Sequence, residues 1–481
     1  MTRRDVSEPA RDEPRILVEH SEYWLSNIGD LAMMDVTVNR LRRRWPGARI
    51  GVLTDTPHLM QAYFPDVDPI DPRGSSVWSD SGLLARLSRK AGPRLVGPVA
   101  IGWVTARAWL PQKAQGLRRR SRRLLARALV RRRADSSEDG PGDGSDDRAE
   151  LVARTASPNT LLAARTSSLV LALGGGYLTD QDFAQSTRVL SLLEHAHIMG
   201  KPTAMLGQGL GPMEEPTLLA RASEVLPSVD FIALRERRKG PALLERVGVA
   251  TARVAVTGDD AIELANSLRR PDLGGDIGVC LRVAGYSPVS DRARGSAASA
   301  LQSVALELGS GLVPITIAEY RSQDRRSTLP LLRGFPERRR PLGRFARPQD
   351  VAVQVGTCRV MVTGAYHAGV FALAQGIPVV ALTSSTYYDD KFLGLVDMFG
   401  TGLELLRLDS EDLGERLVQA VKSAWAGAPQ VRPALLASAA EQIAASQRGF
   451  ERACGLLTEG GDRGPGPEDP ELELRKTEGM Q

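Results

Sequence analysis

The sequence predicts a two-domain α/β protein in which two doubly wound parallel sheets face each other across a cleft. Three observations support this prediction: the length of 481 residues, the alternation of short apolar strands with helices in both halves, and the glycines that directly follow several strands. A single hydrophobic core stops growing at roughly 250–300 residues, so a longer chain divides into domains. Strands that alternate with helices form a parallel sheet, whose ligands bind at the carboxyl ends of the strands.

The alternation begins at residue 15, where a buried strand precedes a stretch with apolar side chains at helical spacing. In the first half we expect strands at residues 15–19, 48–53, 169–173, 203–206, 229–234 and 253–256. After a joint at 266–275, the second half carries strands at residues 276–281, 312–317, 360–362 and 377–382, with helices around 296–308, 348–357, 367–375 and 411–426. The expected domains are residues 14–265 and 266–455, between a disordered N-terminus (1–13) and a disordered tail (456–481).

Residues 86–150 interrupt this alternation and form an insertion in the first domain. An apolar, Trp-bearing stretch at 95–110 precedes a segment, 113–133, that holds ten Lys or Arg residues and no acid. Such a pair is typical of a segment that lies on an anionic membrane surface, which predicts a peripheral membrane contact through residues 95–133. The alternative is an insertion whose basic helix is merely solvated. The acidic stretch 135–150 has the composition of a linker.

Composition excludes several function classes. A net charge of +5 and an aromatic content of 5% do not indicate a dedicated nucleic-acid binder. The three cysteines lack metal-ligand spacing and fit a reducing compartment, so we expect no metal site and no disulfides. Neither a signal-peptide core nor an apolar run of about 18 residues occurs. We therefore expect a cytoplasmic protein, at the inner face of the membrane if the insertion binds there.

Several candidate binding residues follow strands of the first half. Asn27, Gly29 and Asp30 open the first helix, where a helix N-terminus favours an anion and a glycine lets a ligand approach the backbone. A plain helix cap with Asp30 is the alternative. Directly after the strand at 169–173, the three glycines Gly174, Gly175 and Gly176 allow a substrate equally close approach.

Two arginines occupy equivalent places at strand ends, Arg235 in the first half and Arg282 in the second. Arginine suits a bidentate grip on a carboxylate or phosphate, although a lone arginine at a strand end is usually a surface residue. Asp259 and Asp260 follow another strand, where they orient a sugar hydroxyl or an arginine, or else cap a helix. Glycines at 207–211 do not fit the G-x-G-x-x-G dinucleotide pattern, so nicotinamide binding is not expected.

The second half contains the strongest constellation. A buried strand ends at Thr363 and Gly364, and His367 then opens a helix that faces the crevice. Histidine is the side chain suited to general acid–base work near neutral pH, so we place His367 at the chemical centre. Lys391 follows soon after, and a second cation beside His367 indicates an anionic substrate.

Together these blocks resemble the polysaccharide pyruvyl transferase family. No single block is specific, but their order and spacing are. The matching positions, in chain order, are Asn27, Gly29 and Asp30; Gly174–Gly176; Lys201 and Pro202 leading to Gly207–Pro212; Arg235; Leu244–Val249; Gly258–Asp260; His367, Gly376 and Pro378; and Lys391.

The resemblance implies two Rossmann-like domains similar to the B-type glycosyltransferases. It also implies transfer of a pyruvyl group from phosphoenolpyruvate, as co-substrate, to sugar hydroxyls of a cell-envelope or exopolysaccharide glycan or its lipid-linked precursor. No other cofactor is implied. His367, Arg235 and Lys391 would be catalytic, and substrate would contact the positions Asn27, Gly29, Asp30, Gly174, Gly175, Gly176, Gln208, Asp260 and Arg282.

One position departs from the family pattern. Family members often carry an arginine two residues before the histidine, where this chain has Ala365.

Two alternative functions stay open. One is a nucleotide-sugar glycosyltransferase of the same fold, for which Glu319 is the only hint of a ribose contact, and the other is a non-catalytic envelope-assembly protein. The sequence leaves the acceptor glycan open, and also the oligomeric state, a homo-oligomer included.

Overall fold

The computed structural model describes residues 13–20, 23–74, 77–78, 83–106, 157–283, 288–319 and 323–459. The predicted linker at 135–150, the whole basic segment 113–133 and nearly all of both predicted disordered ends lie outside these ranges. Residues 456–459, expected in the tail, instead complete the last helix. Within the described ranges, no helix has the length and apolar character needed to span a bilayer.

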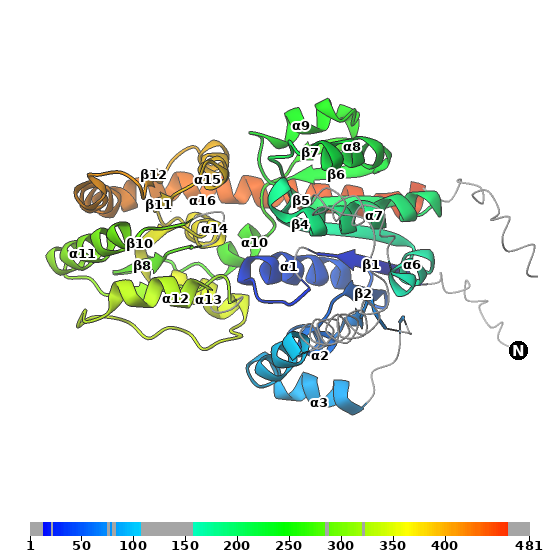
Figure 1. Cartoon of the computed structure of the whole chain (residues 1–481), viewed down its shortest axis with the longest axis horizontal. Helices are drawn as coiled ribbons and strands as arrows, with labels where there is room; N and C mark the ends of the chain where they lie inside the picture. The colour runs from blue at the N-terminus through cyan, green and yellow to red at the C-terminus, as the bar shows by residue number, and fades with distance from the viewer. Residues whose placement is uncertain are drawn as a thin grey trace, which may run out of the picture.

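The first domain is built on a seven-stranded parallel sheet with strand order β3-β2-β1-β4-β5-β6-β7 (Figure 1). Alternate residues of the central strand β4 face opposite sides: Leu171 and Leu173 share a core with helix α1, whereas Ala172 packs with helix α7. Both faces are therefore covered, as a doubly wound sheet requires. The strands are β1 (Arg15–Glu19), β2 (Arg49–Leu53), β3 (Asp68–Ile70), β4 (Leu169–Leu178), β5 (Thr203–Leu210), β6 (Phe231–Leu234) and β7 (Val254–Val256). The helices are α1 (Ile28–Arg44), α2 (Pro57–Tyr63), α3 (Leu83–Ala91), α6 (Pro158–Arg165), α7 (Phe183–Ile198), α8 (Pro216–Val225) and α9 (Gly240–Arg246).

The second domain holds a five-stranded parallel sheet with the order β12-β11-β10-β8-β9. Along the chain, helix α10 (Ala261–Ser267) follows the last strand of the first sheet and precedes the second sheet. The predicted joint at 266–275 begins at the C-terminal end of this helix. The strands are β8 (Asp276–Cys280), β9 (Leu312–Pro314), β10 (Cys358–Thr363), β11 (Val379–Thr383) and β12 (Leu403–Arg407). The helices are α11 (Asp291–Glu307), α12 (Gln323–Thr328), α13 (Pro348–Val355), α14 (Tyr366–Ala374) and α15 (Thr386–Phe399). The predicted pair of parallel sheets is confirmed.

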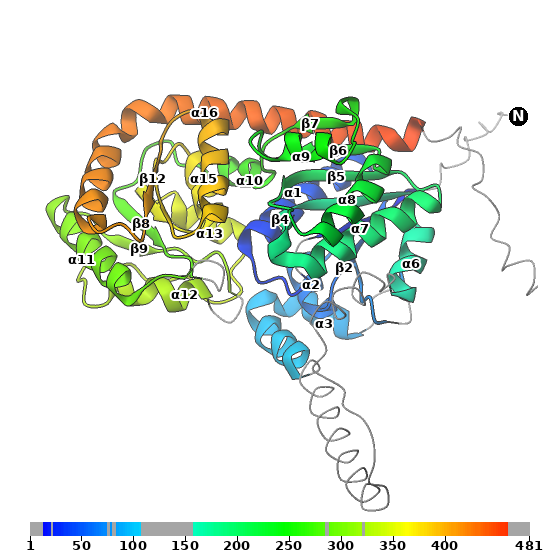
Figure 2. The same ribbon diagram turned by 45° about the horizontal axis from the view of Figure 1, so that its top comes forward.

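The last helix, α16 (Leu413–Glu459), is far longer than the helix expected around 411–426 (Figure 2). It passes through Pro429 and Pro433, although a proline inside a helix costs about 3 kcal/mol. Packing offsets this cost, because Leu435 and Phe450 are buried in the largest core cluster. The helix thereby runs from the second domain back along the first, where the Arg452 guanidinium lies 4.5 Å from the Phe231 ring centroid.

The two sheets meet at the carboxyl ends of their strands. The backbone N–H of Ile28 donates a hydrogen bond to the carbonyl of Ile317 (2.9 Å), which joins the start of α1 to the loop after β9. The hydroxyl of Tyr387 donates to the carbonyl of Gly176 (3.0 Å), which joins α15 to β4. These contacts place the ends of β1, β4, β9 and β11 around one cleft.

Candidate active site

Two cavities lie in the cleft, with volumes of about 540 and 520 Å³. Both volumes are of the size that suits a small ligand. We name them the His367 cavity, which His367, Asn27 and Arg282 help to line, and the Met213 cavity, which Met213 and Lys239 help to line. Their shared wall comes from both domains and consists of Gly176, Gln181, Arg235, Tyr366, Tyr387 and Lys391.

His367 is the second residue of α14 and is 6% exposed. The turn before it is fixed, since the Thr363 hydroxyl accepts a hydrogen bond from the Ala365 N–H (2.9 Å). A Cβ atom on Gly29 would lie 2.0 Å from the His367 ring. Gly29 therefore makes room for the histidine of the other domain, which fills the space where the sequence predicted a ligand.

Asp259 links His367 to Arg235. Its Oδ2 lies 3.6 Å from His367 Nε2 and 3.6 Å from Arg235 Nη1, and its Oδ1 accepts from the Ala261 N–H (2.9 Å). Burial acts to raise the pKa of Asp259, but the hydrogen bond and charge of His367, the charge of Arg235 and the Ala261 amide outweigh burial and lower it. Beyond this contact with each other, neither His367 Nε2 nor Asp259 Oδ2 has a hydrogen-bond partner within the described residues.

Asp260, which the sequence predicted as a substrate contact, points away from both cavities. Its carboxylate accepts a hydrogen bond from the hydroxyl of Ser446 in α16 and lies 3.5 Å from Arg40 Nη1 in α1. It lines neither cavity. Asp260 therefore joins three helices, whereas Asp259, which also lines neither cavity, contacts the cavity-lining residues His367 and Arg235.

Arg235 and Lys391 form the cationic part of the shared wall. A Cβ on Gly176 would lie 2.7 Å from Lys391 Nζ and 3.1 Å from Arg235 Nη2, so only a glycine admits both cations here. Aromatic rings support them: the Arg235 guanidinium lies 4.2 Å from the Tyr366 ring centroid, and Lys391 Nζ lies 4.0 Å from that of Tyr387.

The ammonium group of Lys391 is held at an energetic cost. Burial first, and then the charges of Arg235 and Arg282, lower its pKa well below the ordinary 10.5, while Asp30 opposes them. An anion in the cavity would relieve this cost by compensating the positive charges. The electrostatics of the shared wall thus favour an anionic ligand.

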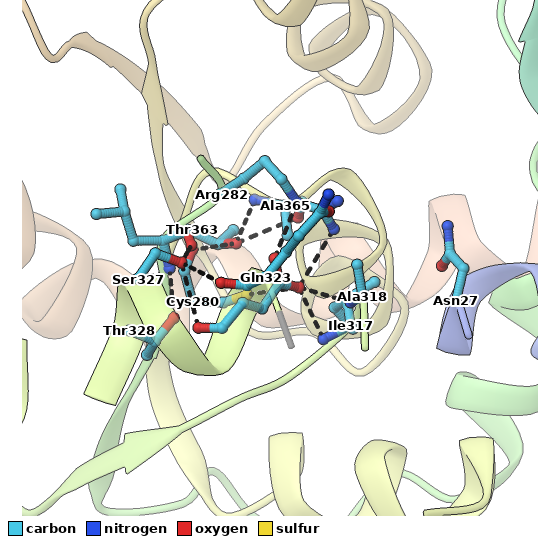
Figure 3. A network of polar contacts seen from close by, with 12 residues as sticks. Asn27, Cys280, Arg282, Ile317, Ala318, Gln323, Ser327, Thr328, Thr363 and Ala365 are labelled. Atoms are coloured by element: carbon cyan, nitrogen blue, oxygen red, sulfur yellow. Dashed lines mark hydrogen bonds and ion pairs between the residues drawn. The ribbon is translucent and has the colours of Figure 1, made fainter. Parts of the chain in front are cut away.

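Arg282 also lines the His367 cavity, and Figure 3 shows it in one network of polar contacts with Ile317 and Ala318. Asp324 in α12 fixes Arg282. Arg282 Nε lies 3.0 Å from Asp324 Oδ1, and the fully buried Asp324 accepts through Oδ2 from the N–H groups of Ile317 (3.0 Å) and Ala318 (2.6 Å). Sequence reasoning did not identify Asp324. Its only signal is a carboxylate in the first turn of a short helix, which many surface helices share.

The remaining predicted residues divide into two groups. Asn27 and Asp30 line the His367 cavity, although the Asn27 side chain also caps α1 by accepting from the Gly29 N–H (3.0 Å). Gly174, Gly175 and Gln208 line neither cavity. The Gln208 amide donates to the carbonyls of Ala172 (3.0 Å) and Leu173 (2.8 Å), and a Cβ on Gly174 would lie 2.2 Å from the Gly207 carbonyl oxygen. Gly174 and Gln208 therefore support the packing of β4 against β5.

Glu319, the hint of a nucleotide ribose contact, is already engaged. Its Oε1 accepts from Nε (2.8 Å) and Nη2 (2.6 Å) of Arg325, and it lines neither cavity.

Solved structures with the same architecture include a protein from Listeria monocytogenes described as a UDP-N-acetylglucosamine 2-epimerase. It is 13% identical, covers 94% of this chain and 98% of its own, and has a TM-score of 0.52. S. aureus MnaA, solved with UDP, is 12% identical, covers 95% of this chain and 100% of its own, and has a TM-score of 0.51. At such low identity these likenesses show the fold alone, which confirms the predicted two-domain fold of the B-type glycosyltransferases.

A search of curated protein sequences found no match. The model of the polysaccharide pyruvyl transferase family, however, matches residues 27–386, about three quarters of the chain. That range includes His367, Asp259, Arg282 and four of the six residues of the shared wall, whereas Tyr387 and Lys391 lie just beyond it. The chain therefore belongs to the polysaccharide pyruvyl transferases, a family of transferases.

Proposed function

We propose that the protein transfers the pyruvyl group of phosphoenolpyruvate to two hydroxyls of a glycan acceptor, as a ketal. The observation that carries this proposal is the composition of the His367 cavity. An acid–base pair, His367 with Asp259, lies beside three cations that come from both domains, Arg235, Arg282 and Lys391.

The cations match the two anionic groups of the donor. Arg235 and Lys391 on the shared wall bind phosphate and carboxylate, for which a planar guanidinium and a compact ammonium are suited. Arg282 supplies a third positive charge, which Asp324 holds in place. Other family members often carry an arginine two residues before the histidine, where this chain has the buried Ala365. We assign to Arg282 the role of that missing cation.

His367 moves the protons of the reaction. It protonates the methylene carbon of the enol, which makes the adjacent carbon an oxocarbenium centre, and a sugar hydroxyl attacks that centre and loses its proton to His367. The bond from this carbon to the phosphate oxygen then breaks, and a second hydroxyl closes the ketal as its proton leaves with the phosphate. Asp259 orients the imidazole and stabilises its protonated form. Fixed cations stabilise the charge that develops on phosphate.

The Met213 cavity suits the glycan acceptor. Its lining includes the carboxylates of Glu214, Glu236 and Asp390, which accept hydrogen bonds from sugar hydroxyls. It shares the wall that holds Arg235 and Lys391, so an acceptor there lies next to a donor in the His367 cavity. No observation favours a nucleotide-sugar donor, because Arg325 already holds Glu319.

The test measures the thermal shift with phosphoenolpyruvate and with UDP-sugars, together with phosphate release from phosphoenolpyruvate when a glycan acceptor is added. We expect a shift with phosphoenolpyruvate that Arg235→Lys and Arg282→Gln reduce. His367→Asn retains the shift and lowers the rate by about 10²–10⁴-fold. His197→Asn, in the exposed last turn of α7, is the control and leaves both unchanged. A shift only with UDP-sugars would overturn the proposal.

A further inference from the structure

Part of the predicted insertion is a helical hairpin on the surface of the first domain. It consists of α3 (Leu83–Ala91), a turn at Gly92 with a φ of 74°, and a second helix over residues 93–106. Its sequence contains no acidic residue and four basic ones, Arg86, Arg89, Lys90 and Arg94. A surface element of 24 residues with basic charges alone is unusual in a chain in which acids and bases are nearly balanced.

One face of the second helix packs against the rest of the protein. Val104 is buried, and Val96 and Ala100 pack partly buried against the largest core cluster. A Cβ on Gly97 would lie 2.4 Å from the ring of Phe345, which belongs to the second domain. Because these contacts fix the orientation of the helix, its opposite face points away from the protein.

The opposite face is apolar and uncovered. Leu95, Val99 and Trp103 recur every fourth residue and are 71%, 74% and 68% exposed, and Leu87 of α3 is also exposed. Single exposed apolar side chains are normal on soluble proteins, but a contiguous stripe of them marks an interaction surface. Figure 2 shows α3 at the lower edge of the first domain, beneath α2 and away from α16.

The charges on the hairpin indicate what covers this stripe. Arg86 and Lys90 are exposed and no acid occurs among the hairpin residues, although Arg94 pairs with Asp350 of α13 at 3.0 Å. A protein interface, by contrast, is typically surrounded by a polar rim of mixed character. Apolar side chains with a tryptophan, flanked only by basic residues, are the features of an element that inserts at the boundary of headgroups and acyl chains. The sequence that follows adds only basic charge up to residue 133.

We propose that the hairpin of residues 83–106 docks the protein onto an anionic lipid bilayer, with Leu95, Val99 and Trp103 inserted and Arg86 and Lys90 at the headgroups. This inference does not rest on the proposed pyruvyl transfer. Of the predicted contact through residues 95–133, it uses only the part that the structure describes.

The experiment measures sedimentation of the full chain with vesicles of phosphatidylcholine, with and without phosphatidylglycerol. We expect binding only to the anionic vesicles and weaker binding as salt is raised. The triple variant Leu95→Ser/Val99→Ser/Trp103→Ser loses at least tenfold in affinity, because each inserted side chain contributes through its apolar area. Arg86→Gln/Lys90→Gln loses about fivefold for each charge, and only with anionic vesicles.

A matched control carries Ile198→Ser, Leu306→Ser and Val353→Ser, three exposed apolar residues on other helices, and binds as the unmodified chain does. Thermal unfolding establishes that all variants are folded, since none of the substituted side chains is buried. Equal affinity of the hairpin variant and the control would overturn the proposal. It is also overturned by equal binding to neutral vesicles, by no binding, or by a dimer in sedimentation velocity that the hairpin variant dissolves.

Discussion

Lys391 is a residue whose buried charge lowers stability and which, in the proposed function, binds the anionic donor. Its ammonium lies against Tyr387 and near two arginines, where burial and those charges lower its pKa. A lysine whose folded-state pKa is lowered destabilises the protein below that pKa. The penalty fades as the pH rises through the lowered pKa toward the ordinary 10.5.

Lys391→Met is therefore expected to raise the unfolding temperature near neutral pH by about 2 °C or more, because it removes a buried charge that Asp30 compensates only in part. The advantage should shrink as the pH is raised, since the unmodified lysine then loses its charge. The same variant should lose the thermal shift with phosphoenolpyruvate. Scans of unfolding temperature against pH, with and without the donor, measure both effects. A variant less stable at every pH would contradict the assignment.

Asp259 and Asp260 are adjacent in sequence but have different surroundings, so they form a matched pair. Asp259→Asn should lower the turnover rate by about 10²–10⁴-fold, because His367 loses the carboxylate that orients it and stabilises its charge. Asp260→Asn should lower stability while leaving the turnover rate within a few-fold, since its contacts are with Arg40 and Ser446. Rates at saturating donor, combined with unfolding curves, separate the two. Equal losses of turnover would contradict the separate roles assigned to the two carboxylates.

At the scale of elements, the site is assembled where strands end and helices begin. Helix α1 follows β1, α14 follows β10, and their first turns meet across the cleft at Gly29 and His367. The close approach of two helix starts requires a residue without a side chain on one of them. The position of His367 thus depends on an element of the other domain.

Gly29→Ala is expected to displace the His367 ring, because the added Cβ would lie 2.0 Å from it. A misplacement of about 1 Å costs roughly 10²-fold in rate, so turnover should fall by that factor while the chain stays folded. Gly295→Ala in α11 is the control: no atom lies within 4 Å of its Cβ, and alanine in an exposed helix stabilises by up to about 1 kcal/mol. Initial rates and unfolding curves of both variants are compared. Full activity of Gly29→Ala would contradict this packing.

For the whole molecule, α16 ties the second domain back onto the first. Its Ser446 accepts a hydrogen bond from Arg40 Nη1 (2.9 Å), and the same buried arginine contacts Glu263 of α10 and Asp260, which directly precedes that helix. This junction connects α1, α10 and α16. Helices α1 and α10 lie between the two sheets, and α16 runs alongside both. The relative placement of the domains, and so the cleft, rests in part on it.

Arg40→Leu should lower the free energy of unfolding by about 3–5 kcal/mol, because it leaves buried carboxylates without their partner. The exposed Arg43 also contacts Glu263, at 3.4 Å, and Arg43→Leu should cost at most about 1 kcal/mol. Denaturant unfolding of both variants measures the difference. Similar losses for the two arginines would show that the junction contributes little to stability.

The pattern of residues determined the two parallel sheets, the order of strands and helices, and the placement of Arg235, Arg282 and His367 at strand or helix ends. Periodicity and strand–glycine boundaries are local properties, which a sequence displays directly. The length of α16 was not predictable in this way, because its prolines oppose a helix locally and only packing against both domains overrides them.

Tertiary structure alone decided which of two neighbouring carboxylates contacts the residues that line the cleft. It selected Asp259 over Asp260, brought Asp324 to Arg282, and gave the space beside Gly29 to His367 of the other domain. It also placed Gln208 and Gly174 where they support the packing of β4 against β5. The physical reason is that such contacts join residues distant in the chain, and their direction depends on how the two domains dock, which a linear pattern does not encode.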